Sequence, residues 1–187
     1  MSADSPIISG GAGDGDSDFA PSWSALLESA LESGDPMRLG RASSIMLIEA
    51  HGFQSKEGEE KWVSAVGAFL EDPRLHRSEQ SASIIAALEV VWKVLSGTSR
   101  AVLLHRMETS FSKFLSDHTR FAISELLGNE AWEDRGVVSI LERLGRNPKY
   151  VPLVIHALED MHQRSPQGVL DGEARNLLAQ LRLATSG

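Results

Sequence analysis

The chain contains no cysteine. Disulfide bonds, thiol nucleophiles and thiolate metal ligands are therefore excluded together. The absence of disulfides fits a reducing compartment, so we expect a cytoplasmic location. No apolar run approaches the roughly 18 residues that a bilayer span needs, and the N-terminus lacks the charged and apolar regions of a signal peptide. We therefore expect neither a membrane span nor export.

Basic residues are absent from residues 1–34, which carry six acidic ones. The whole chain has 18 basic and 26 acidic residues, so the remainder holds 18 basic against 20 acidic residues. A body with nearly balanced charge has no broad field that would attract nucleic acid or an anionic membrane. We expect no nucleic-acid partner.

The stretch SGGAGDGDSDF, residues 9–19, resembles two ligand-binding loops and completes neither. A P-loop needs lysine before its hydroxyl residue, and Asp16 stands there. An EF-hand loop that starts at Asp14 needs glycine and glutamate where Phe19 and Ala25 stand. The composition favours a flexible acidic tether instead. The sequence thus predicts a tail over residues 1–20 and a single helical domain over 21–187.

Apolar residues recur at helical spacing through the body. SASIIAALEVVWKVL places Ile84, Leu88, Val91 and Leu95 on one helical face, and three further segments repeat this pattern. No alternating run bounded by hairpin turns is present. The sequence predicts an all-α protein with about nine helices, ending in a capping helix at about 170–184.

Three segments of the sequence follow the same pattern. Residues 23–36, 62–73 and 132–148 each open with tryptophan, continue as an amphipathic helix and close on Asp-Pro or Asn-Pro. Asp35, Asp72 and Asn147 are suited to cap the following helix, and proline suits its first position. A fourth junction offers Asp117 as a cap but lacks proline. The spacings of 37 and 75 residues correspond to one and two units of a helical repeat.

This pattern resembles HEAT or armadillo repeats. The residues that carry the resemblance are the pairs Asp35/Arg38, Asp72/Arg74, Asp117/Arg120 and Asn147/Lys149. The resemblance implies stacked antiparallel helix pairs in a short, right-handed α-solenoid, with the turn pairs forming a ladder between neighbouring units. The spacings are uneven, and the tryptophan is not part of the usual pattern. A compact helical bundle is the alternative.

No constellation completes a catalytic or metal site. Glu159-x-x-His162 has the spacing of a diiron ligand pair, but no second pair exists. Ser110 and Lys113 have the Ser-x-x-Lys spacing without the further motifs that such enzymes need. We expect no catalytic residue, no metal ligand and no cofactor. Packing between helices is the favoured role of the tryptophans.

Residues 93–120 form the most cationic section of the chain. Its candidate partner-binding residues are Arg100, His105, Arg106, Lys113 and Arg120. An acidic partner, or the chain's own acidic tail, would fit such a surface.

The sequence therefore predicts a non-enzymatic scaffold module that binds a protein or peptide along the second helices of its pairs. A structural subunit of a homo- or hetero-oligomeric assembly, with possible self-association, is one alternative. A small helical metalloprotein or enzyme is the other.

Overall fold

The computed structural model describes residues 22–165 and 172–185, and it contains only helices and their connections there. The α-helices are α1 (Ser22–Ser33), α2 (Pro36–His51), α3 (Lys56–Leu70), α4 (Pro73–Arg77), α5 (Ala82–Val91), α6 (Gly97–Phe111), α7 (Asp117–Asn129), α8 (Val137–Gly145), α9 (Val151–Arg164) and α10 (Gly172–Thr185). Three short 3-10 helices are η1 (Glu79–Ser81), η2 (Trp92–Val94) and η3 (Pro148–Tyr150). The predicted all-α class is confirmed. The predicted tail lies outside the described residues.

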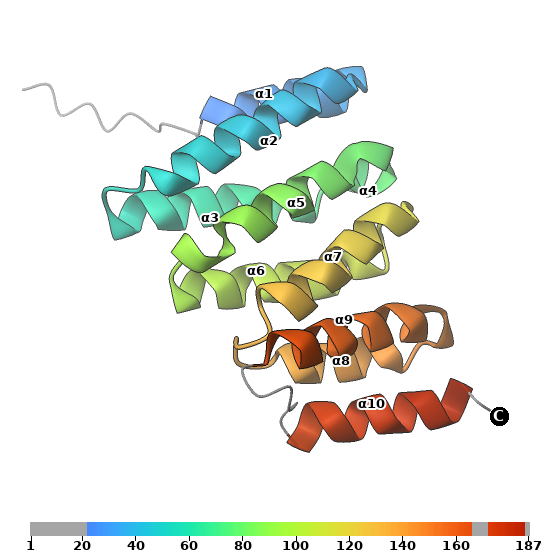
Figure 1. Cartoon of the computed structure of the whole chain (residues 1–187). Coiled ribbons are helices and arrows are strands. Elements are labelled where there is room, and N and C mark those ends of the chain that lie inside the picture. The colour runs from blue at the N-terminus through green and yellow to red at the C-terminus, as the bar shows by residue number, and fades with distance from the viewer. Residues whose placement is uncertain (1–21, 166–171, 186–187) are drawn as a thin grey trace, which may run out of the picture.

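The helices lie in two rows (Figure 1). The second row consists of α2, α5, α7 and α9, and each of these helices packs against the next. The first row consists of α1, α3 with its short continuation α4, α6 and α8. Helix α10 packs on both α8 and α9 at the C-terminal end. The relation to HEAT or armadillo repeats stays a prediction.

The predicted caps are confirmed at three of the four junctions. The side chains of Asp35, Asp72 and Asn147 each accept a hydrogen bond from the backbone N–H two residues later, and proline follows each of them. The prediction for Asp117 is wrong. Ser116 caps α7 by accepting from the backbone N–H of Thr119, because the Asp117 carboxylate is taken by Arg120.

The tryptophans do not mark equivalent positions. Trp62 lies in the middle of α3, because the polar residues from Lys56 onward, capped by Ser55, already belong to that helix. Trp132 lies in the connection before α8. Trp23 and Trp62 are nevertheless buried and meet edge to face, with their ring centroids 6.1 Å apart. The first two pairs therefore share one aromatic core, as the packing role predicts.

Local ion pairs replace the ladder that the repeat resemblance implies. The acidic and basic residues of three turns bond within their own turn, as Asp35–Arg38, Asp72–Arg74 and Asp117–Arg120. Of these bases, Arg74 also reaches an earlier helix, pairing with Glu28 of α1 at 2.8 Å. The turn pairs thus stabilise helix starts first, and Arg74 alone among the three also joins neighbouring pairs.

Gly128 fixes the closest approach between α7 and α9. A Cβ atom at this position would lie 2.6 Å from the carbonyl oxygen of Ala157 and 2.8 Å from Cβ of Asp160. No side chain fits there without moving one helix, so glycine sets the spacing of the second row at this point. The same contact fixes the position of Asp160.

We predict that Gly128→Ala destabilises the protein by about 1–3 kcal/mol, because the methyl group overpacks the contact with α9. Gly40→Ala is the matched control, since Gly40 is exposed within α2 and a Cβ there meets nothing within 4 Å. That substitution should stabilise by about 0.5–1 kcal/mol. Thermal and urea unfolding measure both changes. An unchanged stability of Gly128→Ala would contradict the packing.

Candidate functional site

Arg100 is held by an internal acid. Its Nε donates to Oδ1 of Asp134 at 2.8 Å, and Nε1 of Trp92 donates to the other oxygen of the same carboxylate at 2.7 Å. A further bond runs from Arg100 to the carbonyl of Leu95. Arg100 therefore ties the connection before α8 to the ends of α5 and α6, and it offers little to a partner.

Arg106, His105 and Lys113 gather around one acid of the same chain. Arg106 donates to Glu71 at 2.6 Å, and this bond holds the pKa of the Glu71 carboxyl below its ordinary value. Lys113 and His105 lower that pKa further through their charge. The acidic group that the cationic section was predicted to receive is thus already present, at the end of α3.

A second ion pair repeats this arrangement one step along the first row. Glu108 of α6 accepts two hydrogen bonds from Arg143 of α8. Glu108 and Arg143 each lie 37 residues after Glu71 and Arg106. This regular spacing indicates that the cations of α6 and α8 hold neighbouring first-row helices together.

Arg120 is inside the protein, with 4% of its surface exposed. Its guanidinium donates to the carbonyl of Phe114 and to Asp117, whose pKa it lowers, and it lies 6.0 Å from the ring centroid of Tyr150. It stabilises the turn between α6 and α7. We therefore leave Arg120 out of any binding surface.

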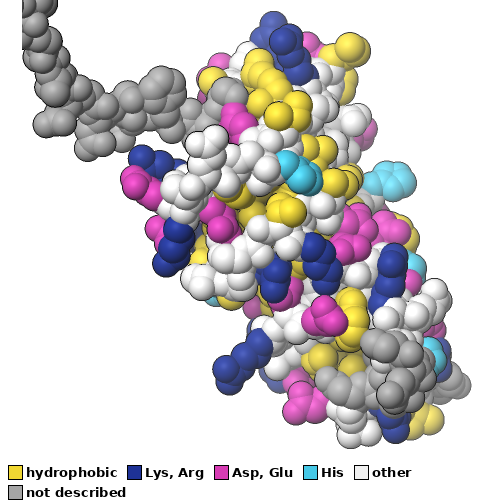
Figure 2. Space-filling view, turned by 60° about the vertical axis from the view of Figure 1, so that its left-hand side comes forward, with side chains coloured by type: hydrophobic (Ala, Val, Ile, Leu, Met, Phe, Trp, Pro, Cys, Tyr) yellow, Lys and Arg dark blue, Asp and Glu magenta, His cyan; other side chains and the backbone are white. Residues whose placement is uncertain are grey.

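The five predicted cations thus do not form one cationic surface. Arg106 pairs with Glu71, whose pKa Lys113 and His105 also lower through their charge, while Arg100 pairs with Asp134 and Arg120 is buried. Figure 2 shows the side of the inter-pair connections, where Lys and Arg side chains are interspersed with Asp and Glu. On this side of the molecule (Figure 2), interspersed charges of both signs give no extended field for an acidic partner.

We predict that Arg106→Glu lowers the melting temperature, because it sets two carboxylates against each other beside Gly67. Adding Glu71→Arg should recover most of the loss, with a coupling of about 0.2–1 kcal/mol, as for exposed pairs. Arg41→Glu is the control, since Arg41 is exposed and forms no ion pair among the described residues. A double variant no more stable than Arg106→Glu alone would contradict the pairing.

The histidine and acid spacing on α9 serves packing. Glu159 accepts a hydrogen bond from Arg182 of α10 at 2.6 Å, and His162 is exposed. The ring of His156 stacks on Phe121 of α7 at 4.8 Å. Within residues 22–165 and 172–185, no three His, Asp or Glu side chains converge as metal ligands would.

The outer surface of the second row, which we call the second-row face, exposes apolar side chains. Met37, Ile48 and Val90 are 81%, 71% and 63% exposed, and Phe121 is 40% exposed. On α2 the exposed positions 37, 41, 44 and 48 follow helical spacing, opposite the buried stripe that packs on the interior. Among the described residues, the second row thus leaves Met37, Ile48 and Val90 largely exposed, whereas Phe121 is exposed on one side and stacks on His156.

Carboxylates lie close together on the same face. Burial raises the pKa of the Glu89 carboxyl on α5 above its ordinary value, and three neighbouring carboxylates raise it further. These neighbours are Glu125 of α7, Glu130 directly after α7, and Asp160 of α9. Arg164 acts in the opposite direction. The balance leaves a negative area between α5, α7 and α9.

Asp160 carries an oxygen with unused hydrogen-bonding capacity. Its Oδ2 is buried and lies 3.4 Å from Nε2 of His156, too poorly placed for a hydrogen bond. Gly128 and Phe121 hold these two side chains in place from α7. The acidic and aromatic parts of the second-row face therefore meet at the α7–α9 contact.

We predict that Glu89→Gln raises the melting temperature at pH 7. The pKa of Glu89 is raised on folding, so its ionised form disfavours the folded state above that pKa. This cost disappears as the pH falls below the ordinary value of 4.5, and the variant and the parent should then converge. Glu32→Gln, at an exposed position of α1, should change nothing at either pH. A lower melting temperature for Glu89→Gln at pH 7 would contradict this account.

The comparisons give no relative from which function can be transferred: no family model matches the chain, and no curated protein or solved structure matches it either. In the part of the chain that the structure describes, no helix is long and apolar enough to cross a bilayer. The surface of the protein is therefore the feature that bears on its function.

Proposed function

We propose that this protein is a non-enzymatic interaction module whose second-row face binds a protein segment that carries lysine or arginine next to apolar side chains. The observation that carries the proposal is the combination, on neighbouring second-row helices, of exposed Val90 and Phe121 with the carboxylates around Glu89. We keep the predicted location of the binding surface, along the second helices of the pairs. We propose a basic partner segment, however, where the cationic section of the sequence suggested an acidic one.

The charge of the face selects the sign of the partner. A lysine or arginine brought near Glu89, Glu125 and Asp160 relieves the repulsion that raises the pKa of Glu89. An acidic segment would increase that repulsion. Complementarity of this kind determines partner choice and association rate more than it determines affinity.

The apolar side chains supply the affinity. Fully burying a valine, isoleucine or phenylalanine side chain contributes roughly 1.5–3 kcal/mol each, and the side chains at the centre of an interface contribute most. Val90 and Phe121 border the carboxylates, whereas Met37 and Ile48 lie one helix further along the row. A partner that spans α2 to α9 would bury all four.

Selection from a random peptide display library tests this proposal without a known partner. The full-length protein is immobilised, and the enriched sequences are synthesised and titrated against three proteins by calorimetry. The first is the parent, and the second carries Val90→Ser with Glu125→Lys on the second-row face. The third, a matched control, carries Val102→Ser with Glu32→Lys, both at exposed positions of first-row helices.

We expect enriched peptides that combine lysine or arginine with apolar residues. Their affinity should fall at least about tenfold for the second-row variant, which corresponds to about 1.4 kcal/mol, and stay unchanged for the control. Enrichment of acidic peptides, or an equal loss with both variants, would overturn the proposal. Matching melting temperatures of the three proteins confirm that binding alone has changed.

A further inference from the structure

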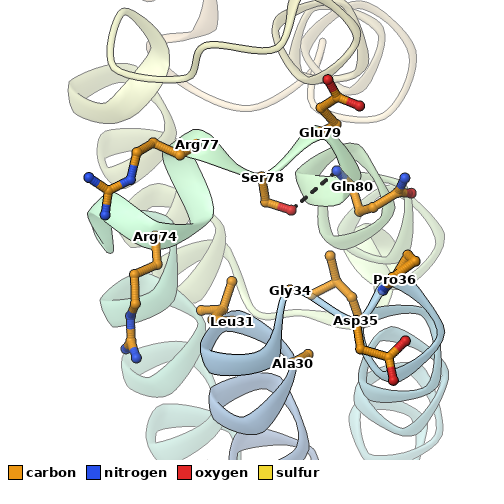
Figure 3. Close-up of a pocket in the computed structure, with 11 residues that line it drawn as sticks. Ala30, Leu31, Gly34, Asp35, Pro36, Arg74, Arg77, Ser78, Glu79 and Gln80 are labelled. Atoms are coloured by element: carbon orange, nitrogen blue, oxygen red, sulfur yellow. Dashed lines mark hydrogen bonds between the residues drawn. The ribbon is translucent and has the colours of Figure 1, made fainter.

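A pocket of about 420 Å³ lies at the turn end of the first two helix pairs. Its lining includes apolar Ala30, Leu31 and Leu39 from α1 and α2, Ser78 from the turn after α4, and Gln80 from η1. Figure 3 shows Leu31 and the Ser78 hydroxyl pointing into the space, with Arg77 at its edge. None of the residues that line this pocket is among those named for the second-row face.

Aromatic rings fill the spaces between the later turns. Phe114, in the turn of the third pair, packs edge to face on His76 of the second pair at 4.9 Å. The next residue, Leu115, donates its backbone N–H to the His76 carbonyl at 2.9 Å. Between the third and fourth pairs, the ring of Tyr150 packs on Phe111 at 5.0 Å. Each later junction thus receives a large side chain from the turn that follows.

The first junction lacks such a side chain. Only Gly34 and Asp35 connect α1 to α2, and Gly34 has a positive φ of 68°. The Asp35 side chain is occupied with capping α2. Such a short turn has no apolar residue to place between the pairs, so Leu31 and Leu39 line an open pocket.

We propose that residues 4–8 of the same chain, Asp-Ser-Pro-Ile-Ile, occupy this pocket, with Ile7 and Ile8 in the place that an aromatic ring takes at the later junctions. Thirteen residues, 9–21, connect this segment to α1. For a Gly-rich chain of that length the root-mean-square span is about 20 Å. Helix α1, with 12 residues, is about 18 Å long. The connection therefore has the length that the distance from one end of α1 to the other requires.

The length of the chain between Phe19 and α1 excludes Phe19 as the residue that fills the pocket. Phe19, the only aromatic residue before α1, is three residues from Ser22 and extends about 10 Å at most. The pocket lies at the opposite end of α1, so Phe19 falls short. Ile7 and Ile8 are the large aliphatic residues that remain beyond the Gly/Asp/Ser stretch.

The rim carries charges of both signs, and Arg77 is the charge that fits this occupant. Arg77 and Glu79 are both exposed at the edge of the pocket, and neither forms an ion pair among the described residues. Asp4 precedes Ile7 by three residues, and residues 1–21 contain no basic residue. With Ile7 in the pocket, Asp4 reaches Arg77. A short connection keeps the local concentration of the segment in the millimolar range, which lets a small contact persist.

The absence of native cysteine allows a clean cross-linking test on the full-length protein. Ile8→Cys is combined with Ser78→Cys at the pocket, or with Ser44→Cys, an exposed position on α2, as the control. The rate of disulfide formation in a glutathione buffer is followed by gel electrophoresis under non-reducing conditions. We expect an intramolecular disulfide at position 78 that forms at least about tenfold faster than at position 44.

Equal rates at the two positions would overturn the proposal. A covalent dimer in place of the monomer would also overturn it, because a second copy would then supply the segment. In a second measurement, Ile7→Asp with Ile8→Asp should shift the backbone amide signals of Leu31, Ser78 and Gln80. Signals that stay in place would refute occupancy of the pocket even if the cysteine substitutions perturb the turn.

Discussion

The burial of one face of every long helix between two rows is the constraint on which the rest of this structure depends. The core is one continuous cluster from Trp23 to Leu178, and it takes up the inward faces of both rows. Each second-row helix then has one face left over. Side chains on those remaining faces do not have to pack in the core, so exposed apolar side chains and clustered carboxylates there call for a functional explanation.

The charges divide between the two rows according to the same constraint. First-row helices meet through long arginine side chains that reach acids of the neighbouring helix, as in Arg106–Glu71 and Arg143–Glu108. These ion pairs neutralise the cations and join neighbouring first-row helices. The carboxylates of α5, α7 and α9 have fewer such partners, and Glu89 shows the consequence in its raised pKa. A basic segment of the kind proposed above would supply the positive charge that these carboxylates lack.

Features of the fold that depend only on residues close together in the sequence could be predicted from it. Asp35, Asp72 and Asn147 act as caps because a cap needs only the next few residues. The sequence pattern places a helix start at Trp62, but α3 begins at Lys56. The polar residues before Trp62 fit a helix as well as a loop, so the pattern could not locate the start. The partners of Arg106 and Phe121 lie 35 residues away, so only the order and register of the stacked helices bring them together. For that reason the sequence of the cationic section suggests an acidic partner, whereas in the structure Arg106 and Arg100 already pair with acids of the same chain.

The central claim is that the second-row face is the binding surface, and amide chemical-shift mapping with a library-selected peptide tests it most directly. The protein is labelled with nitrogen-15 at full length and titrated until the shifts saturate. The account predicts the largest shifts at Val90, Phe121, Glu125 and Asp160, which belong to three neighbouring helices. Shifts confined to first-row positions such as Ser64 and Val102 would contradict it.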